Sequence, residues 1–207
     1  MINKPTFGIF LLSAVLFISA CRSNTDTDTS KTATDQLESF ADLQILKYDV
    51  PGWDDLDPKQ KELAYYLYEA ALSGRDIIYD QRGKYNLLIR KTIEAIWDDP
   101  ATEKSGKDWE AFRTYAGQVW FSNGIYHHYS NDKFTPGFNE EYFVSLLKAI
   151  NEENLPLEEG EDINKFVTRI KPVIFDPNFA PKMVNLKEGI DNVVGSANNF
   201  YENLNQK

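Results

Sequence analysis

The stretch "KDWEAFRTYAGQVWF", residues 107–121, is the clearest indicator of the fold class of this chain. Its apolar residues recur at three- and four-residue steps, which places them along one stripe of a helix: Trp109, Phe112, Ala116, Val119 and Trp120. This spacing predicts an amphipathic α-helix that buries one side against a core.

A second helix is predicted in "LDPKQKELAYYLYEAALSGRDIIYDQ", residues 56–81. Asp57 is the expected N-cap, and Pro58 occupies the first helical position, where its missing N–H does no harm. Apolar residues follow at helical spacing, among them Leu63, Leu67 and Ile77. Glycine inside a helix costs about 1 kcal/mol relative to alanine, so Gly74 suggests that another segment packs closely there.

Three further stretches repeat the helical period: residues 84–97, the residues after an expected N-cap at Asn139, and residues 161–175, where Pro172 should kink or close the helix. Their expected inward-facing residues are Tyr85, Leu88, Ile89, Ile93, Ile96, Tyr142, Phe143, Leu146, Leu147, Ile150, Ile163, Phe166, Val167 and Ile170. The chain reads as extended after Pro177, with a loop and a short helix expected in residues 189–204. Since little alternating pattern is visible, the predicted fold class is mainly α.

The N-terminus, "MINKPTFGIFLLSAVLFISACRSN", has the pattern of a secretory signal. Lys4 precedes an apolar run that is too short to cross about 30 Å of hydrocarbon. The letters "ISAC" resemble a bacterial lipobox, which implies that residues 1–20 are removed and that Cys21 is lipidated. An ordinary secretory signal, with Cys21 near its cleavage point by chance, is the alternative.

The lipobox reading predicts a lipid-anchored protein of the cell envelope, with the outer membrane of a Gram-negative bacterium as the expected location. Residues 21–36 are rich in Thr, Ser and Asp, so they are predicted to form a flexible tether. The folded part is expected at residues 37–207. Cys21 is the only cysteine, so the mature chain has no pair of thiols for a disulfide or a thiolate zinc site.

The net charge of the chain limits the classes of binding partner that are expected. The formal net charge is −10 and the sequence pI is about 4.7. Proteins that bind nucleic acid concentrate lysine and arginine on one face, so no nucleic-acid partner is expected. The acidic run Glu152 to Asp162 lacks the spacing of a calcium loop and is predicted to be a solvated loop.

The only two histidines are adjacent, at His127 and His128 in "FSNGIYHHYSNDKF", residues 121–134. Neighbouring side chains diverge by about 100° on a helix and point to opposite faces on a strand, so a local metal site is not expected. The chain also has no G-x-S-x-G elbow and no Walker loop. Residues 121–134 are therefore predicted to be a loop that is either structural or in contact with a substrate.

Five longer stretches suggest a family: "FADLQILKYDVPGWDDLDPKQKELAYYLYEAALSGRDIIYDQ", "KYNLLIRKTIEAIW", "VWFSNGIYHHYSNDKFTPGF", "PVIFDPNFAPKMVNL" and "GSANNFYE". Between Phe40 and Glu202 they resemble, in order, the N-terminal part of bacterial zinc-dependent dipeptidyl peptidase III. The resemblance implies a complete α+β enzyme with two lobes around a wide cleft. One lobe is mostly helical and carries zinc, and the other contains a β-barrel. Such an enzyme releases dipeptides from the N-termini of short peptides.

The catalytic motifs of that family are absent from this sequence. They are H-E-x-x-G-H and an E-E-x-x-A-type helix, and no histidine follows His128. In the complete enzyme, zinc polarises the carbonyl of the scissile bond and the motif's glutamate acts as the base. No catalytic residue and no metal ligand can therefore be assigned here, and the chain alone is expected to bind no zinc and to be inactive.

The resemblance leaves the status of residues 37–207 open between two explanations. They are an incomplete N-terminal portion of a two-lobed metallopeptidase, from a truncated or split gene, or a short relative that serves as a membrane-tethered peptide-binding scaffold. A third explanation is that residues 37–207 do not fold by themselves, because helices that should pack against absent lobes would leave large apolar patches exposed.

The resemblance also implies that the loop at 121–134 faces the cleft. Its candidate contacts to a short peptide substrate are Asn123, His128, Asp132 and Lys133. The alternative is that four aromatic residues pack the loop down and its polar groups satisfy the backbone. These residues are Tyr126, Tyr129, Phe134 and Phe138.

Overall fold

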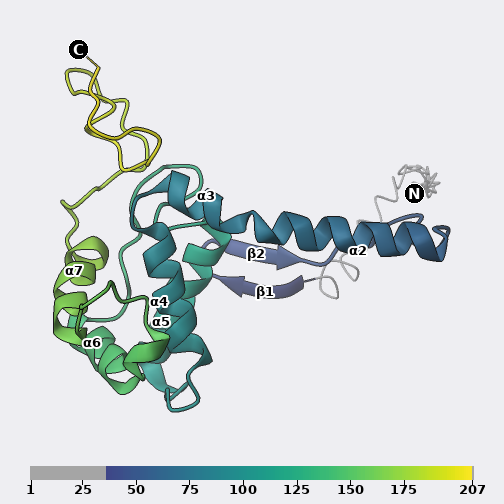
Figure 1. Cartoon of the computed structure of the whole chain (residues 1–207), viewed down its shortest axis with the longest axis horizontal. Coiled ribbons are helices and arrows are strands. Elements are labelled where there is room, and N and C mark those ends of the chain that lie inside the picture. The colour runs from purple at the N-terminus through teal and green to yellow at the C-terminus, as the bar shows by residue number, and fades with distance from the viewer. Residues whose placement is uncertain (1–35, 207) are drawn as a thin grey trace, which may run out of the picture. The chain divides into compact units, whose positions relative to one another are not determined.

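The computed structural model describes residues 36–206, and it is mainly helical, as predicted (Figure 1). The described elements are β1 (Gln36–Phe40), β2 (Leu43–Leu46), α2 (Pro58–Ser73), α3 (Arg75–Arg82), α4 (Asn86–Asp98), α5 (Gly106–Ser122), α6 (Glu140–Ala149), the 3-10 helix η1 (Glu152–Asn154) and α7 (Ile163–Phe175). The signal peptide, Cys21 and all of the predicted tether except Gln36 lie outside the described residues.

A short hairpin that the sequence pattern did not predict precedes the helices. β1 and β2 are antiparallel, and Phe40 lies opposite Leu43, so Ala41 and Asp42 form the turn. Ala41 has a φ of 49°, which is the left-handed region. Strands of five and four residues are too short for an alternating pattern to stand out in the sequence.

The helix predicted in residues 56–81 is divided at Gly74. Its start was predicted correctly, because the Asp57 carboxylate accepts the N–H groups of Lys59 and Gln60, and Gln60 Oε1 accepts the N–H of Asp57. Gly74 ends α2 with its N–H donating to Ala71 O at 3.2 Å. A Cβ placed on Gly74 would meet only that oxygen, at 3.7 Å, so the prediction of close packing at Gly74 was wrong.

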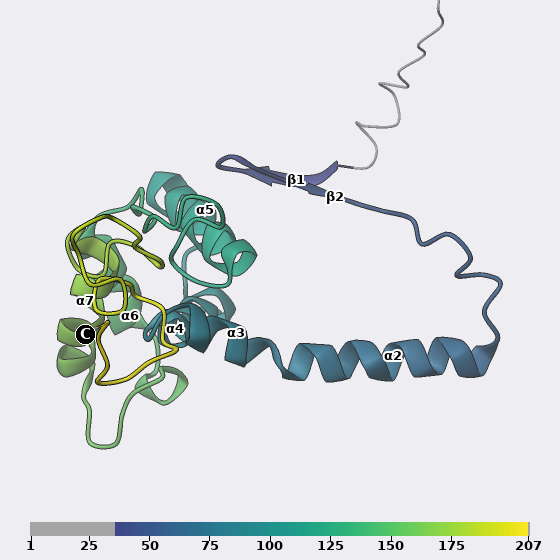
Figure 2. The same cartoon turned by 90° about the horizontal axis from the view of Figure 1, so that it is seen from above.

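The apolar residues of α2 were expected to be buried, and they are not. No residue of α2 is buried, and Leu63 and Leu67 are 59% and 62% exposed. In α3 only Tyr79 is buried, while Ile77 is 60% exposed. Figure 2 shows α2 with no other helix packed along it.

The core lies among α4, α5, α6 and α7, where most of the predicted inward-facing residues are confirmed. Those that are buried are Ile89, Ile93, Ile96, Trp109, Phe112, Ala116, Val119, Phe143, Leu146, Leu147, Ile150, Phe166 and Ile170. Asn139 caps α6 by accepting the N–H of Tyr142 at 2.8 Å. Pro172 lies inside α7, which continues to Phe175, so this proline does not end the helix.

The chain after α7 has no helix in its described residues, so the short helix expected within 189–204 was wrong. Asp191 organises this segment instead. One carboxylate oxygen accepts the N–H groups of Val193 and Val194, and the other accepts that of Gln206. An aspartate that bonds to the backbone in this way favours turns over helix.

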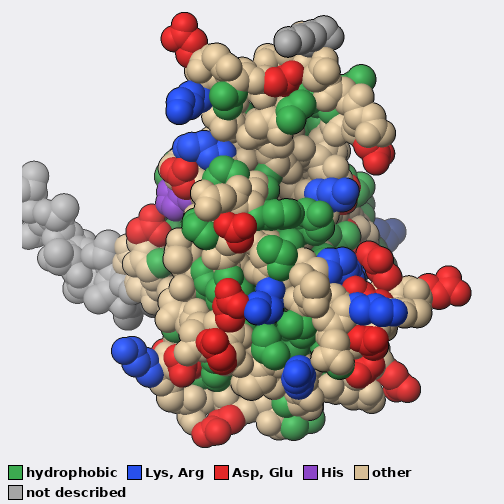
Figure 3. Space-filling model, turned by 90° about the vertical axis from the view of Figure 1, so that its left-hand side faces the viewer, with side chains coloured by type: hydrophobic (Ala, Val, Ile, Leu, Met, Phe, Trp, Pro, Cys, Tyr) green, Lys and Arg blue, Asp and Glu red, His purple; other side chains and the backbone are tan. Residues whose placement is uncertain are grey.

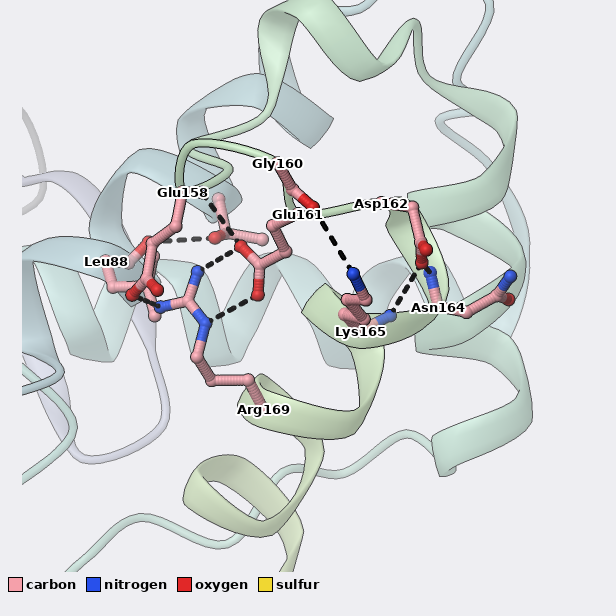
Figure 4. A network of polar contacts seen from close by, with 9 residues as sticks. Leu88, Glu158, Gly160, Glu161, Asp162, Asn164, Lys165 and Arg169 are labelled. Carbon is pink, nitrogen blue, oxygen red and sulfur yellow. Dashed lines mark hydrogen bonds and ion pairs between the residues drawn. The ribbon is translucent and has the colours of Figure 1, made fainter.

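The acidic run before α7 contains one carboxylate that is not solvated as predicted. Glu161 receives two hydrogen bonds from Arg169, at 2.8 and 2.6 Å, and its side chain is 9% exposed (Figure 4). Glu158 lies 3.2 Å from the same guanidinium but remains mostly exposed. The Arg169 guanidinium therefore ties the loop before α7 to that helix.

We expect Glu161→Gln to lower the free energy of unfolding by about 2 kcal/mol near neutral pH, because an amide accepts weaker hydrogen bonds from a guanidinium than a carboxylate does. Hydrogen bonding to Arg169 holds the pKa of Glu161 below its ordinary value. A carboxyl group with a depressed pKa in the folded state stabilises above its unfolded pKa, and this contribution is lost as the pH falls through the folded pKa.

The difference between the parent chain and Glu161→Gln should therefore shrink steadily as urea unfolding is measured from neutral pH toward acid. Glu159→Gln is the matched control, since Glu159 is exposed in the same loop. A difference that stays constant with pH would contradict this account.

The surface over α6 and α7 carries acidic and basic side chains intermixed, with hydrophobic side chains between them (Figure 3). No helix within residues 36–206 combines the length and the apolar character that crossing a membrane requires.

Candidate functional site

The histidine stretch forms a closed loop between α5 and α6. Asn123 ends α5 in the left-handed conformation, with a φ of 52°. Two backbone hydrogen bonds then close the loop on itself, from Phe134 N to Ile125 O and from His127 N to Asp132 O, both at 2.8 Å. The prediction of a loop is confirmed for residues 123–134, whereas Phe121 and Ser122 are the last two residues of α5.

A buried asparagine fixes the start of this loop to α4. Asn86 is 1% exposed, and its Oδ1 accepts the N–H of Ile125 at 3.2 Å. The backbone of Gly124 lies so close that a Cβ at this position would be 2.2 Å from Asn86 Nδ2. The loop therefore needs both the asparagine and the glycine.

The ring of His127 is engaged at both nitrogens. Nδ1 accepts the backbone N–H groups of Tyr129 and Ser130, each at 3.2 Å. In the neutral ring Nε2 then carries the proton, and it lies 3.1 Å from Asp42 Oδ2 at the hairpin turn. This hydrogen bond holds the pKa of Asp42 below its ordinary value. His127 thus joins the loop to the β1–β2 hairpin.

The two histidine side chains were expected to diverge, and in this loop they do not. The ring of His128 stacks on that of His127, with centroids 4.5 Å apart, and it also packs against Tyr129 at 4.2 Å and Phe121 at 5.1 Å. The expectation assumed helix or strand geometry, whereas a turn brings neighbouring side chains onto the same side. His128 Nδ1 is buried and has no hydrogen-bond partner within the described part of the chain.

Two neighbouring charged residues near the end of the loop, Asp132 and Lys133, contact α7 and the segment after it. Asp132 forms an ion pair with Lys182 at 2.7 Å, which keeps the pKa of Asp132 below its ordinary value. Lys133 Nζ donates to Val173 O at 3.2 Å, Phe179 O at 2.7 Å, and Asp176 O. Burial lowers the pKa of Lys133. Its ammonium group therefore satisfies carbonyls at the C-terminal end of α7 and in the segment that follows it.

The four predicted contact residues thus do not converge on one point. Asn123 shapes the end of α5, His128 packs in an aromatic stack, and Asp132 and Lys133 are engaged with residues 173–182. Within residues 36–206, no three acidic or histidine side chains lie together in a way that would hold a metal ion. These residues do not fit a zinc site, so no catalytic step is assigned to them.

The aromatic residues of the loop divide into two groups. Tyr126, Phe134 and Phe138 are buried, as the structural alternative predicted. Tyr129 is 83% exposed, so its expected packing role was wrong. The Tyr126 hydroxyl donates to Ala180 O at 2.9 Å, and burial raises the pKa of Tyr126.

A second candidate site, which the sequence did not suggest, lies between the hairpin and α5. It is a cavity of about 520 Å³ that also reaches the end of α4. Its apolar wall is formed by Phe40, Ile45, Trp97, Trp120 and Phe121. Arg113 and Glu38 supply its charged groups, and they form an ion pair at 2.6 Å.

The hairpin can approach α5 because Gly117 has no side chain. A Cβ at Gly117 would lie 2.8 Å from the ring of Phe40. The glycine within the helical pattern at 107–121 was therefore the one sequence signal that another segment packs closely there.

The chain was also compared with known protein families and with curated proteins. A scan against protein families finds none that matches the chain, and a search of curated proteins finds no match either.

Proposed function

We propose that this chain is the non-catalytic N-terminal portion of a zinc-dependent exopeptidase of the dipeptidyl peptidase III type. It packs against the portion of the enzyme that carries the zinc motif, and Cys21 anchors it in the cell envelope. The proposal starts from the five stretches between Phe40 and Glu202 that resemble this family. The mainly helical fold is consistent with it.

The observation that carries the proposal is the exposure of α2. Residues 63–68, "LAYYLY", are all apolar or aromatic, and successive helical residues are 100° apart, so together they cover every side of the helix. Leu63, Tyr65, Tyr66, Leu67 and Tyr68 are each between 57% and 62% exposed. A helical stretch that is apolar all round is typical of a protein interior, and in α2 this stretch lies between the charged residues Lys61, Glu62 and Glu69.

A partner that packs on only one side of α2 would not bury all of the exposed side chains of residues 63–68. A second copy of the chain packed on one side would leave the remaining sides in water. A larger polypeptide that surrounds the helix would cover all of them, as the remainder of an enzyme does. Tyr48 and Val50, in the segment before α2, are 80% and 68% exposed and extend this unpartnered surface.

In the complete enzyme, the loop at 121–134 would line the peptide-binding cleft. Asn123, His128 and Asp132 are the proposed contacts, and Tyr129, which is 83% exposed, is an additional one. We include Lys133 as a residue that supports the loop, because its ammonium group is held by three carbonyls of residues 173–179.

The test is reconstitution of activity. The full chain with zinc should not hydrolyse an arginyl-arginyl-naphthylamide substrate. Activity should appear when the chain is mixed with the zinc-carrying portion of a bacterial dipeptidyl peptidase III expressed without its own N-terminal portion. Hydrolysis by this chain alone, with one zinc bound per chain, would contradict the non-catalytic assignment.

Variants of α2 test whether this helix makes the contact. Leu63→Glu with Leu67→Glu should abolish the reconstituted activity and co-purification without lowering the melting temperature of the isolated chain, because both side chains are exposed. Lys61→Glu with Glu69→Lys is the matched control, which alters polar positions of the same helix at constant net charge. Equal reconstitution by both variants would exclude α2 as the contact surface.

A further inference from the structure

The cavity beside the hairpin combines an apolar interior with one positive and one negative group. Trp97 and Trp120 pack edge to face with centroids 5.1 Å apart, and Phe40 and Ile45 face them from the hairpin. Cavities that bind small molecules commonly enclose about 300–1,000 Å³ and are mostly apolar with a few polar groups, and this cavity of about 520 Å³ falls within that range.

The ion pair of the cavity is placed where a ligand can compete for it. Arg113 Nη2 and Glu38 Oε1 are 2.6 Å apart, and the two side chains are 48% and 45% exposed. An ion pair this exposed adds little to stability, so replacing it with ligand contacts has a small cost. The Arg113 guanidinium is suited to a carboxylate, and the Glu38 carboxylate is suited to an ammonium group.

We propose that this cavity binds an apolar amino acid or a short dipeptide in its zwitterionic form. The ligand's carboxylate contacts Arg113, its α-ammonium group contacts Glu38, and its side chain enters the wall formed by Phe40, Ile45, Trp97, Trp120 and Phe121. The cavity has a positive group, a negative group beside it and an apolar wall. A zwitterion with an apolar side chain has a complementary group for each of these. The inference does not depend on the proposed function, because every group involved belongs to this chain.

Other ligand classes fit the cavity less well. A neutral apolar molecule would use the wall but would leave the ion pair without a role in recognition. A simple carboxylate would displace Glu38 from Arg113 and leave the Glu38 carboxylate without its partner. A zwitterion supplies a partner for each of the two charged groups.

The first test uses the unmodified full chain. L-leucine and leucyl-leucine are titrated separately by calorimetry and by tryptophan fluorescence, since Trp97 and Trp120 line the cavity. Comparison of the two shows whether the amino acid or the dipeptide is preferred. Removal of one charge, in 4-methylpentanoate or isopentylamine, should weaken binding at least about tenfold, which corresponds to about 1.4 kcal/mol. Glycine, which lacks the apolar side chain, should not bind measurably.

The second test locates the site. Arg113→Gln and Glu38→Gln should each weaken binding of the preferred ligand by about tenfold or more. Glu110→Gln is the matched control, because Glu110 also contacts Arg113, at 3.4 Å, but does not line the cavity. It should leave the affinity unchanged.

Three results would overturn the proposal. They are the absence of saturable binding at millimolar concentrations of both ligands, equal affinity for the singly charged analogues, and unchanged affinity in both cavity variants. The ligand series needs no substitution, so it decides the question even if a variant shifts the hairpin. Failure here leaves the reconstitution result untouched, so the two proposals fail separately.

Discussion

Replacing Phe138 by alanine is expected to lower the free energy of unfolding by about 4 kcal/mol, within the range for large buried aromatic residues. Phe138 is 5% exposed, and its ring lies between α5 and α7. Its centroid is 5.6 Å from those of Phe112 and Tyr115 in α5 and 5.8 Å from that of Phe175 in α7. Alanine would leave a cavity at the point where these helices meet.

Tyr129→Ala is the matched control for this prediction. It removes an aromatic residue from the same connection between α5 and α6, but one that is 83% exposed, so the change should stay within about 0.5 kcal/mol. Urea unfolding followed by circular dichroism measures both variants. Losses of similar size in the two would show that Phe138 is not the residue that joins these helices.

Those two aromatic residues illustrate a limit of the sequence pattern. The structural alternative for the loop expected both of them to pack it down. It could not tell them apart, because a loop has no period from which an inward-facing residue can be identified. In α4, α5, α6 and α7 the period of 3.6 residues distinguishes inward-facing from outward-facing residues, and most of the predicted core residues there are buried. A regular backbone is what makes the direction of a side chain predictable.

In α2 the helical spacing of apolar residues led to a wrong prediction of burial, for a different reason. Apolar spacing indicates that a helix has a surface to bury, but it does not say whether the partner lies in the same chain. Leu63 and Leu67 have the helical spacing of core residues and are nevertheless exposed. Gly74 was read as a site of close packing, whereas Gly117 is the glycine that another segment approaches.

The candidate sites depend on contacts that local spacing does not encode. Asp42 and His127 are 85 residues apart in sequence, and Glu38 and Arg113 are 75 residues apart. Both pairs involve the short hairpin, whose position depends on how residues 36–206 fold as a whole. Lys133 could be recognised as a charged loop residue, but its three carbonyl partners at the end of α7 could not.

Gly124→Ala should have an effect comparable to that of Phe138→Ala, with an expected loss of about 3 kcal/mol or more. Gly124 has a φ of 143°, which residues with a side chain rarely adopt. A Cβ at this position would also lie 2.2 Å from Nδ2 and 2.5 Å from Cγ of Asn86. The new methyl group must expel the Asn86 side chain, which would break its hydrogen bond to the N–H of Ile125.

Gly74→Ala is the matched control, and its effect should have the opposite sign. Gly74 has a φ of −83°, and a Cβ there would meet nothing closer than Ala71 O at 3.7 Å. Alanine fits this conformation and reduces the freedom of the unfolded chain, so we expect stabilisation of about 0.5–1 kcal/mol. Thermal and urea unfolding of the two variants should therefore shift in opposite directions.

A double variant separates the two causes of the loss at Gly124. If the clash with Asn86 dominates, Asn86→Ala combined with Gly124→Ala should be less destabilising than the sum of the two single changes, by at least about 1 kcal/mol. If strain in the backbone dominates, the effects should add within about 0.5 kcal/mol. Additivity would mean that the strained backbone at residue 124, and not the contact with the Asn86 side chain, accounts for the loss, since removing that side chain would then restore nothing.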